Sequence, residues 1–246
     1  MNPPTARSTP PPSSLPAATR HRPTIARAVL VASVTLAVIA GVAAAGCSAH
    51  PPREKGPFRA PDLVELVTVD STIHLDIRYA TANNFVGRPL YRQARAFLQR
   101  PAAEALVRVS ARLRAQGYGL LVFDGYRPWQ VTKLFWDVTP PDKHDYVADP
   151  KQGSRHNRGC AVDLSLYDLA TGAEVAMPSP YDSMTDTAHP DYAGGDPAAR
   201  ARRDLLRAAM EAEGFAVYEF EWWHFDFKDW RLYPILDLPF ERLGVR

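Results

Sequence analysis

The sequence has little cysteine, and its first 52 residues contain no acidic residue. Only two of its 246 residues are cysteines, Cys47 and Cys160, so a hydrophobic core rather than a disulfide framework must hold the fold. The first 52 residues contain four of the 29 basic residues, nine of the 23 prolines and none of the 27 acids. The rest of the chain is therefore close to neutral, which gives no support for nucleic acid as a partner. With 46% hydrophobic residues, the chain is not disordered as a whole.

Residues 1–46 predict a disordered basic leader that ends in an export signal. Residues 1–27 are rich in Pro, Ser, Thr and Arg and lack a periodic apolar face. Residues 28–45 then read AVLVASVTLAVIAGVAAA without a charge, which is the pattern of the apolar part of an export signal. An uncleaved transmembrane anchor is the alternative, because about 18 apolar residues is the lower limit for crossing a bilayer.

The end of this signal resembles a bacterial lipobox. Its residues are Ala44-Ala45-Gly46-Cys47, with Ala44 where Leu is usual. We therefore expect lipid on Cys47 and an exported protein on the outer face of the bacterial cytoplasmic membrane. A periplasmic or secreted protein is the other alternative. A membrane is a partner only through the lipid or an uncleaved signal segment.

The remaining chain divides into a linker over residues 47–57 and one domain over residues 58–246. Alternating polarity or short apolar runs predict strands in four regions: 63–79, 119–123, 161–166 and 215–227.

Helical spacing with proline or glycine at the ends predicts three helices: residues 101–116, a segment that starts at 128, and residues 197–213. In the second helix, Val131, Leu134 and Phe135 are expected to face inward. This order predicts an α+β fold with a mainly antiparallel sheet and helices to one side.

The segment from Ser154 to Asp163 contains two side chains that zinc accepts as ligands. His156 and Asp163 are separated by Gly159, which lets the chain turn and bring both to one point. Such a pair also occurs by chance, as a satisfied loop histidine and an aspartate at a strand edge. Cys160 could be a ligand or a nucleophile, although a lone cysteine is more often a small buried hydrophobe.

A second candidate is Glu221-Trp222-Trp223-His224, in an otherwise apolar aromatic segment. Burying a carboxylate and an imidazole there is costly without partners, and a metal ion with its bound water would supply them. With the histidine and aspartate above, His224 completes three ligands, and one water makes the open tetrahedral site of a catalytic zinc. The two tryptophans are expected to pack in the core.

The third candidate is Arg127, in the DGYRP sequence of residues 124–128, which follows a predicted buried strand. Its fixed charge and forked donors suit a carbonyl oxygen that becomes an oxyanion. The alternative is a structural ion pair.

Five ordered motifs resemble those of the VanX-type D-alanyl-D-alanine dipeptidases, zinc peptidases of family M15 with the hedgehog/D,D-peptidase fold. The similarity runs from about Leu63 to Tyr233. The motifs are YAT and NNFVG within residues 79–87, GYGLL at 117–121, DGYRP at 124–128, S-x-H-x-x-G-x-A-x-D at 154–163 and EWWH at 221–224.

The resemblance implies one zinc ion per chain, a general base, an arginine for the transition state and four residues for the substrate. These are His156, Asp163 and His224 for the zinc, Glu221 for the base, Arg127 for the transition state, Ser154 for the substrate carboxylate, Asp182 for its ammonium, and Tyr79 and Tyr91 for the pocket wall.

The expected activity is zinc-dependent hydrolysis of the small dipeptide D-Ala-D-Ala to two D-alanines, by metal-activated water with Glu221 as base. One alternative is a D,D-carboxypeptidase, or a related peptidase, that acts on peptidoglycan stem peptides. The other is a non-catalytic zinc-fold binding module, which would be expected to lose Glu221 or Arg127, and both are present.

Overall fold

The computed structural model describes residues 49–244. The leader, the export signal and Cys47 lie outside this range. No helix within it is long and apolar enough to cross a membrane. In the expected linker, Glu54 forms an ion pair with Arg158 and accepts a hydrogen bond of 2.8 Å from the backbone N–H of Ile235. This part of the linker is therefore fastened to the domain.

Eleven strands and α-helices build the part of the chain that the structure describes. The strands are β1 (Leu63–Glu65), β2 (His74–Leu75), β3 (Phe97–Gln99), β4 (Tyr118–Asp124), β5 (Ala161–Asp168), β6 (Phe215–Tyr218) and β7 (Glu221–Phe227). The α-helices are α1 (Leu66–Val69), α2 (Arg100–Arg114), α3 (Trp129–Val138) and α4 (Pro197–Glu211).

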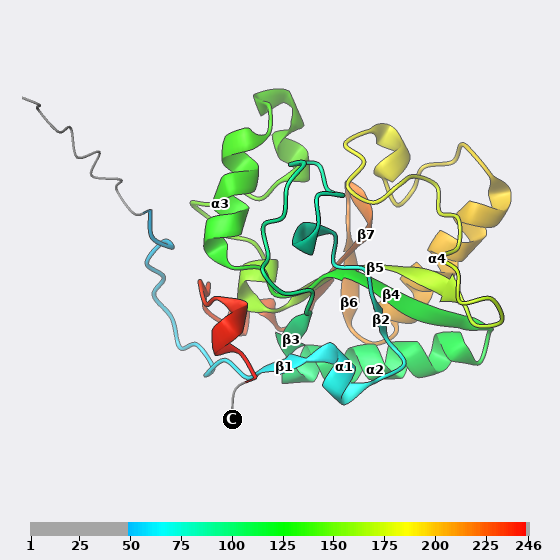
Figure 1. The fold of residues 1–246 in the computed structure, drawn as a ribbon, viewed down its shortest axis with the longest axis horizontal. Coiled ribbons are helices and arrows are strands. Elements are labelled where there is room, and N and C mark those ends of the chain that lie inside the picture. Colours follow the sequence, from blue (N-terminus) through cyan, green and yellow to red (C-terminus); the bar gives the residue numbers. More distant parts are fainter. Residues whose placement is uncertain (1–48, 245–246) are drawn as a thin grey trace, which may run out of the picture. The chain divides into compact units, whose positions relative to one another are not determined.

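Five strands form the central sheet, in the order β2-β4-β5-β7-β6 (Figure 1). Strand β2 is parallel to β4, and all other neighbours are antiparallel. Strands β1 and β3 pair separately as an antiparallel ribbon. The predicted α+β class with a mainly antiparallel sheet is confirmed.

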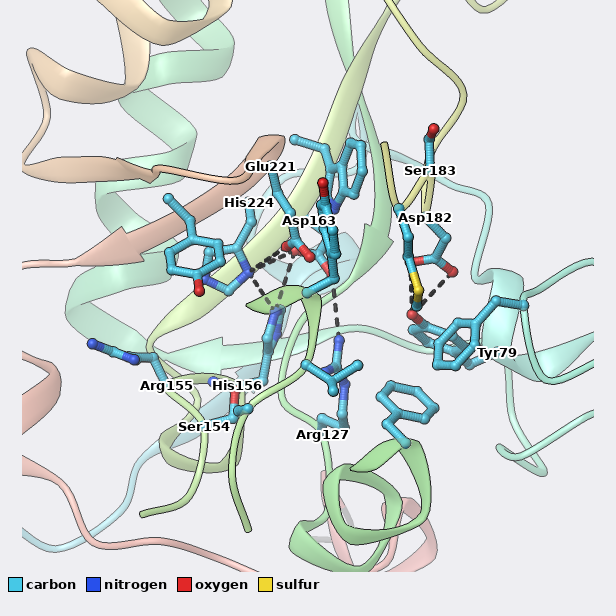
Figure 2. Close-up of a pocket in the computed structure, with 18 residues that line it drawn as sticks. Tyr79, Arg127, Ser154, Arg155, His156, Asp163, Asp182, Ser183, Glu221 and His224 are labelled. Atoms are coloured by element: carbon cyan, nitrogen blue, oxygen red, sulfur yellow. Dashed lines mark hydrogen bonds and ion pairs between the residues drawn. The ribbon is translucent and has the colours of Figure 1, made fainter. Parts of the chain in front are cut away.

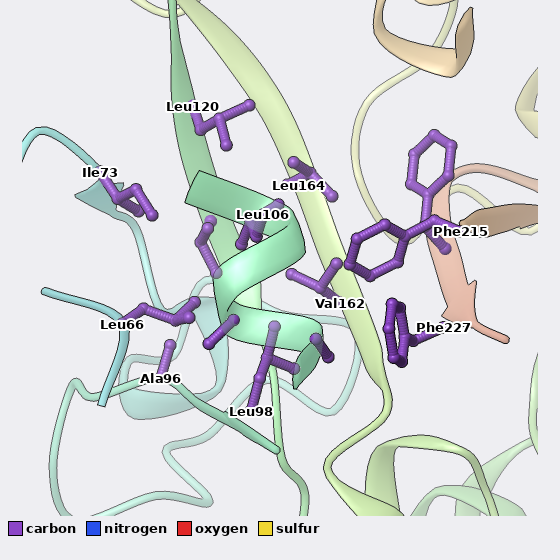
Figure 3. Close-up of a cluster of buried hydrophobic side chains, with 14 of the residues drawn as sticks. Leu66, Ile73, Ala96, Leu98, Leu106, Leu120, Val162, Leu164, Phe215 and Phe227 are labelled. Atoms are coloured by element: carbon purple, nitrogen blue, oxygen red, sulfur yellow. The ribbon is translucent and has the colours of Figure 1, made fainter. Parts of the chain in front are cut away.

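Helices α2 and α4 contact each other and strands of the sheet. Leu106 of α2 is completely buried and lies near Leu120, Val162 and Leu164 of the sheet (Figure 3). Helix α2 has proline in its first turn, and Gly117 follows its end with φ +86°, the left-handed region that stops helices. Sequence therefore located this helix to within two residues.

Helix α3 departs from the predicted arrangement, because it lies apart from α2 and α4 (Figure 1). It buries Trp129, Thr132 and Phe135, whereas Val131 and Leu134 are only partly buried. The Phe135 ring lies 4.8 Å from that of Tyr79, between ring centroids. Both rings belong to the hydrophobic core and also line the site described below, so α3 joins the core to the site.

The strands expected in residues 63–79 are present as β1 and β2, but these two do not pair with each other. The helical turn α1 separates them, and they pair with β3 and β4 respectively. Another strand prediction needs correction. The aromatic segment at 215–227 is a hairpin of β6 and β7 rather than one strand region. Strand β3 was not predicted at all. Pairing with distant segments decides the arrangement of β1, β2 and β3, and the turn at residues 219–220 decides the hairpin; local alternation reveals neither.

Candidate active site

Two neighbouring strands, β5 and β7, and the turn before β5 bring three potential metal ligands together. Asp163 of β5 and His224 of β7 are directly opposite in the sheet register, so their side chains share one face. His156 comes from the turn before β5, and the chain reverses at Gly159 with φ +66°. This positive φ favours glycine, and a Cβ atom at Gly159 would also lie 2.4 Å from Leu63 Cδ2, which would have to move.

The ligand atoms of these three buried side chains all lie within 4.8 Å of one another (Figure 2). Asp163 Oδ1 is 3.2 Å from His156 Nε2 and 3.0 Å from His224 Nδ1. The two histidine nitrogens are 3.0 Å apart. The predicted ligand set is therefore brought together by the fold.

Each histidine has an inner ring nitrogen that faces the ligand cluster and an outer one that faces away from it. The hydrogen-bond acceptor next to the outer nitrogen determines the tautomer. His156 Nδ1 is 2.6 Å from the carbonyl oxygen of Gly125, and His224 Nε2 is 2.9 Å from Asp226 Oδ1. In the neutral imidazoles, these acceptors place the proton on the outer nitrogen, which leaves a lone pair on each inner nitrogen. Asp163 Oδ1 is buried without a hydrogen-bond partner. Three acceptors facing one point without a donor fit a metal cation.

Charge in this cluster also favours a cation. Burial opposes the ionisation of Asp163, but the two histidines outweigh burial and hold its pKa well below the usual range. Burial lowers the pKa of His224, but Asp226 and Asp163 outweigh that effect and raise it to about 10. The surroundings thus attract positive charge, whether a proton or a metal ion carries it.

Arg127 is both an ion-pair partner and a pocket residue. Its Nε donates to Asp124 Oδ2 at 2.9 Å, and its Nη2 lies 3.4 Å from Asp163 Oδ2. Its guanidinium also lies over the ring of Phe135, 4.7 Å from the centroid. These contacts fix the guanidinium beside the metal ligands, while Nη1 has no protein acceptor within residues 49–244.

The prediction that Tyr91 forms part of the pocket wall is wrong. Its hydroxyl donates to both oxygens of Asp124, at 3.0 and 3.1 Å, and the side chain does not line the cavity. Tyr91 therefore orients the aspartate that holds Arg127, one layer behind the site.

Glu221 faces the cavity beside His224, although residues three apart on a regular strand point to opposite faces. The pairing of β6 with β7 is irregular here: Val217 pairs with Phe225, and the next residue, Tyr218, pairs with Glu221. This irregularity brings Glu221 Oε2 to 3.8 Å from His224 Nδ1. Burial raises the pKa of Glu221 to about 8.

Asp182 supplies a further, partly buried carboxylate, on the side of Asp163 away from Glu221 and His224 in Figure 2. The Tyr79 hydroxyl lies 2.9 and 3.0 Å from its two oxygens. Asp182 is the sole non-glycine residue between 49 and 244 with positive φ, at +61°. Burial raises its pKa to about 7, and the charge of Asp163 adds to this effect.

One cavity contains every predicted site residue of the domain except Tyr91. Ser154 lines it as well, and its Oγ accepts a hydrogen bond of 3.2 Å from the backbone N–H of His156, so its own hydroxyl proton is available to a ligand. Cys160 and both tryptophans of the EWWH motif are almost completely buried, as expected for core residues, and Trp223 also lines the cavity.

The sequence did not reveal the residues that orient the ligands. Asp226 holds His224, and the Tyr181 hydroxyl donates to Asp163 Oδ2 at 3.0 Å. Asp226 could have been found, because residues two apart on a strand share a face. Tyr181 lies on a loop, and no local pattern marks it.

The chain matches a family model and several known proteins. A family model for peptidase M15, described as D-ala-D-ala dipeptidase, matches residues 59–239. The D-alanyl-D-alanine dipeptidase of Escherichia coli (strain K12) is 35% identical over 175 residues, which cover 71% of this chain and 89% of that protein. Those of Enterococcus faecalis (strain ATCC 700802 / V583) and Streptomyces coelicolor (strain ATCC BAA-471 / A3(2) / M145) are 36% and 37% identical over 186 and 180 residues, covering 68% and 65% of this chain and 88% of each relative.

Proposed function

Because the chain belongs to peptidase family M15, the D-ala-D-ala dipeptidases, we propose that it hydrolyses the dipeptide D-Ala-D-Ala to two D-alanines with one zinc ion. The observation that carries the proposal is the convergence of three lone pairs, from His156, Asp163 and His224, beside Glu221. A partly buried carboxylate, Asp182, lines the same cavity.

Two neutral imidazoles and one carboxylate are a donor set that catalytic zinc uses, with a further position left open. When bound, zinc acts as a Lewis acid, which lowers the pKa of water and polarises a peptide carbonyl. The hydrogen bonds to Gly125 and Asp226 hold the two imidazoles in the required tautomers.

Glu221 is the proposed general base. Its carboxylate accepts a proton from the attacking water and returns that proton to the nitrogen of the leaving D-alanine. Burial places its pKa close to neutral, where a carboxyl group can both take and give a proton. The placement of Oε2 beside His224 keeps the carboxylate next to the metal ligands.

Arg127 is the proposed stabiliser of the oxyanion that forms as water attacks the carbonyl. Asp124 and Asp163 bind Nε and Nη2, so the guanidinium is fixed before the substrate arrives, and Nη1 remains able to donate. A preorganised donor of this kind is worth about 2.7–4 kcal/mol in the transition state.

Asp182 is the proposed partner of the substrate ammonium group. A partly buried carboxylate whose protonated form is favoured by its surroundings gains most from a cation, and a free amino terminus provides one. An acylated amino terminus would leave the carboxylate unpaired, so the site favours a dipeptidase over a D,D-carboxypeptidase. The presence of Glu221 and Arg127 in the cavity weighs against a non-catalytic binding module.

The direct test is to incubate the purified protein with D-Ala-D-Ala and, separately, with an N-acetylated tripeptide that ends in D-Ala-D-Ala. We expect rapid release of D-alanine from the dipeptide and slow release from the acetylated peptide. Preferential cleavage of the acetylated peptide would replace this proposal with the carboxypeptidase, and cleavage of neither would favour the binding module.

We also propose that residues 1–46 export the protein, that Cys47 carries a lipid, and that residues 47–57 link this anchor to the catalytic domain of residues 58–246. The uncharged apolar run and the lipobox-like end support this placement outside the cytoplasmic membrane. Labelling with a radioactive fatty acid is expected for the wild type and not for Cys47→Ala. Lipid retained on that variant would refute the lipobox.

A further inference from the structure

A second arginine, Arg155, lines the cavity on the side of the metal ligands opposite Asp182 (Figure 2). It directly follows Ser154, whose hydroxyl faces the same cavity. Its side chain is 41% exposed. The cavity thus has a partly buried carboxyl group on one side and a cation at its solvent-accessible edge on the other.

The donors of Arg155 are largely unused. Nε lies 3.3 Å from Asp226 Oδ2 but makes no well-aligned hydrogen bond. The guanidinium carbon lies 4.7 Å from the centroid of the Trp230 ring. Neither Nη1 nor Nη2 has an acceptor among residues 49–244. Arg127, the other arginine of the cavity, already binds two aspartates.

A free dipeptide carries an ammonium group and a carboxylate at its two ends. If Asp182 takes the ammonium, the carboxylate lies on the far side of the scissile bond and needs donors there. One serine hydroxyl supplies one hydrogen bond and no charge, whereas a guanidinium fork supplies two parallel hydrogen bonds and a positive charge.

We propose that Arg155 binds the C-terminal carboxylate of the dipeptide together with Ser154, and so makes a free carboxyl terminus a requirement for good substrates. This inference rests on the proposed dipeptidase function. Asp226 forms an ion pair with Arg155 at Nε, and the Trp230 ring covers one face of the guanidinium. The two terminal nitrogens are therefore left to the substrate.

The test compares D-Ala-D-Ala with D-alanyl-D-alaninamide, which has the same backbone but no C-terminal charge. For Arg155→Ala we expect kcat/KM for D-Ala-D-Ala to fall about tenfold, mainly through KM. This is the lower end for a hydrogen bond between charged groups, because solvent screens a partly exposed guanidinium. Turnover of the amide should stay unchanged, and Arg155→Lys should recover part of the loss.

Arg231→Ala is the matched control. Arg231 stacks on the same Trp230 ring, with its guanidinium carbon 4.1 Å from the ring centroid, but it does not line the cavity. The Arg231→Ala variant should keep the wild-type ratio of kcat/KM for D-Ala-D-Ala to kcat/KM for the amide. Metal content and thermal unfolding of both variants show whether the site is intact.

Binding gives a readout without turnover. In the Glu221→Gln background, calorimetric titration with D-Ala-D-Ala should show an affinity about tenfold lower when Arg155→Ala is added, with no change for the amide. If wild type hydrolyses D-Ala-D-Ala but Arg155→Ala loses activity equally on both substrates, or on neither, the carboxylate assignment is wrong. If wild type does not hydrolyse D-Ala-D-Ala, the proposed function itself fails.

Discussion

The two faces of strand β5 differ in polarity and in what they pack against. Val162 and Leu164 point into the hydrophobic core beside helix α2 (Figure 3), and Leu166, two residues further along the same face, is buried in the same core. Asp163 points the other way, into the cluster of metal ligands (Figure 2). One run of alternating residues therefore builds the core with one face and the active site with the other.

The two faces also differ in how burial of their side chains affects the stability of the fold. Each fully buried aliphatic side chain on the core face contributes about 1.5–3 kcal/mol to folding. The opposite face holds carboxyl groups against their preference for water, since burial raises the pKa of Glu221 and of Asp182. Groups with such shifts are typical of sites arranged for chemistry. Substitutions on the two faces should therefore separate activity from stability.

The largest effect on activity is expected from His156→Ala, which removes one of three metal ligands. Bound zinc and D-Ala-D-Ala hydrolysis should both be lost, because the remaining two ligands hold the ion weakly. Elemental analysis of the purified protein and an assay for released D-alanine check this together. Full zinc occupancy in the variant would show that His156 is not a ligand.

Glu221→Gln should lower kcat by about 10²–10⁴ because the amide cannot accept the water proton. Zinc content and the free energy of unfolding should remain close to those of the wild type, since the side chain keeps its shape. Steady-state kinetics and urea unfolding measure the two quantities. Near-normal turnover with zinc bound would contradict the acid–base role.

Leu106→Ala tests the core face of the sheet, against which helix α2 packs. Leu106 is completely buried, so the cavity left behind should lower the free energy of unfolding by about 2–5 kcal/mol. At a temperature where the variant stays folded, its kcat/KM should equal that of the wild type. A loss of activity in the folded variant would show that the two faces are not independent.

Asp182→Asn should lower kcat/KM for D-Ala-D-Ala about tenfold to a hundredfold, because a neutral amide pairs less well with an ammonium group. Zinc content should not change. Asp186→Asn, an exposed position of the same loop that does not line the cavity, is the control. An equal effect of both substitutions would mean that Asp182 does not bind the substrate.

The parts that could be predicted from the sequence are those that local chemistry determines. Pro101 and Gly117 mark the ends of α2, and Gly159 provides the turn that joins His156 to Asp163. Such signals depend on the conformational preferences of single residues, so they survive in any tertiary context.

The parts that could not be predicted depend on contacts between distant segments. Strand β3 forms because it pairs with β1, and Tyr91 turns away from the cavity because Asp124 accepts its hydroxyl proton. The free donors of Arg155 can also be identified only from the three-dimensional structure, because its neighbours Asp226 and Trp230 are distant in the chain. Spacing along the chain carries no information about such partners.

Metal removal and restoration test the central claim that the polar face of this sheet is a zinc-dependent catalytic site. Protein stripped with a chelator should release no D-alanine from D-Ala-D-Ala, and activity should rise linearly with added zinc until one equivalent per chain is bound. Full activity in the stripped protein, with zinc absent by elemental analysis, would contradict the account.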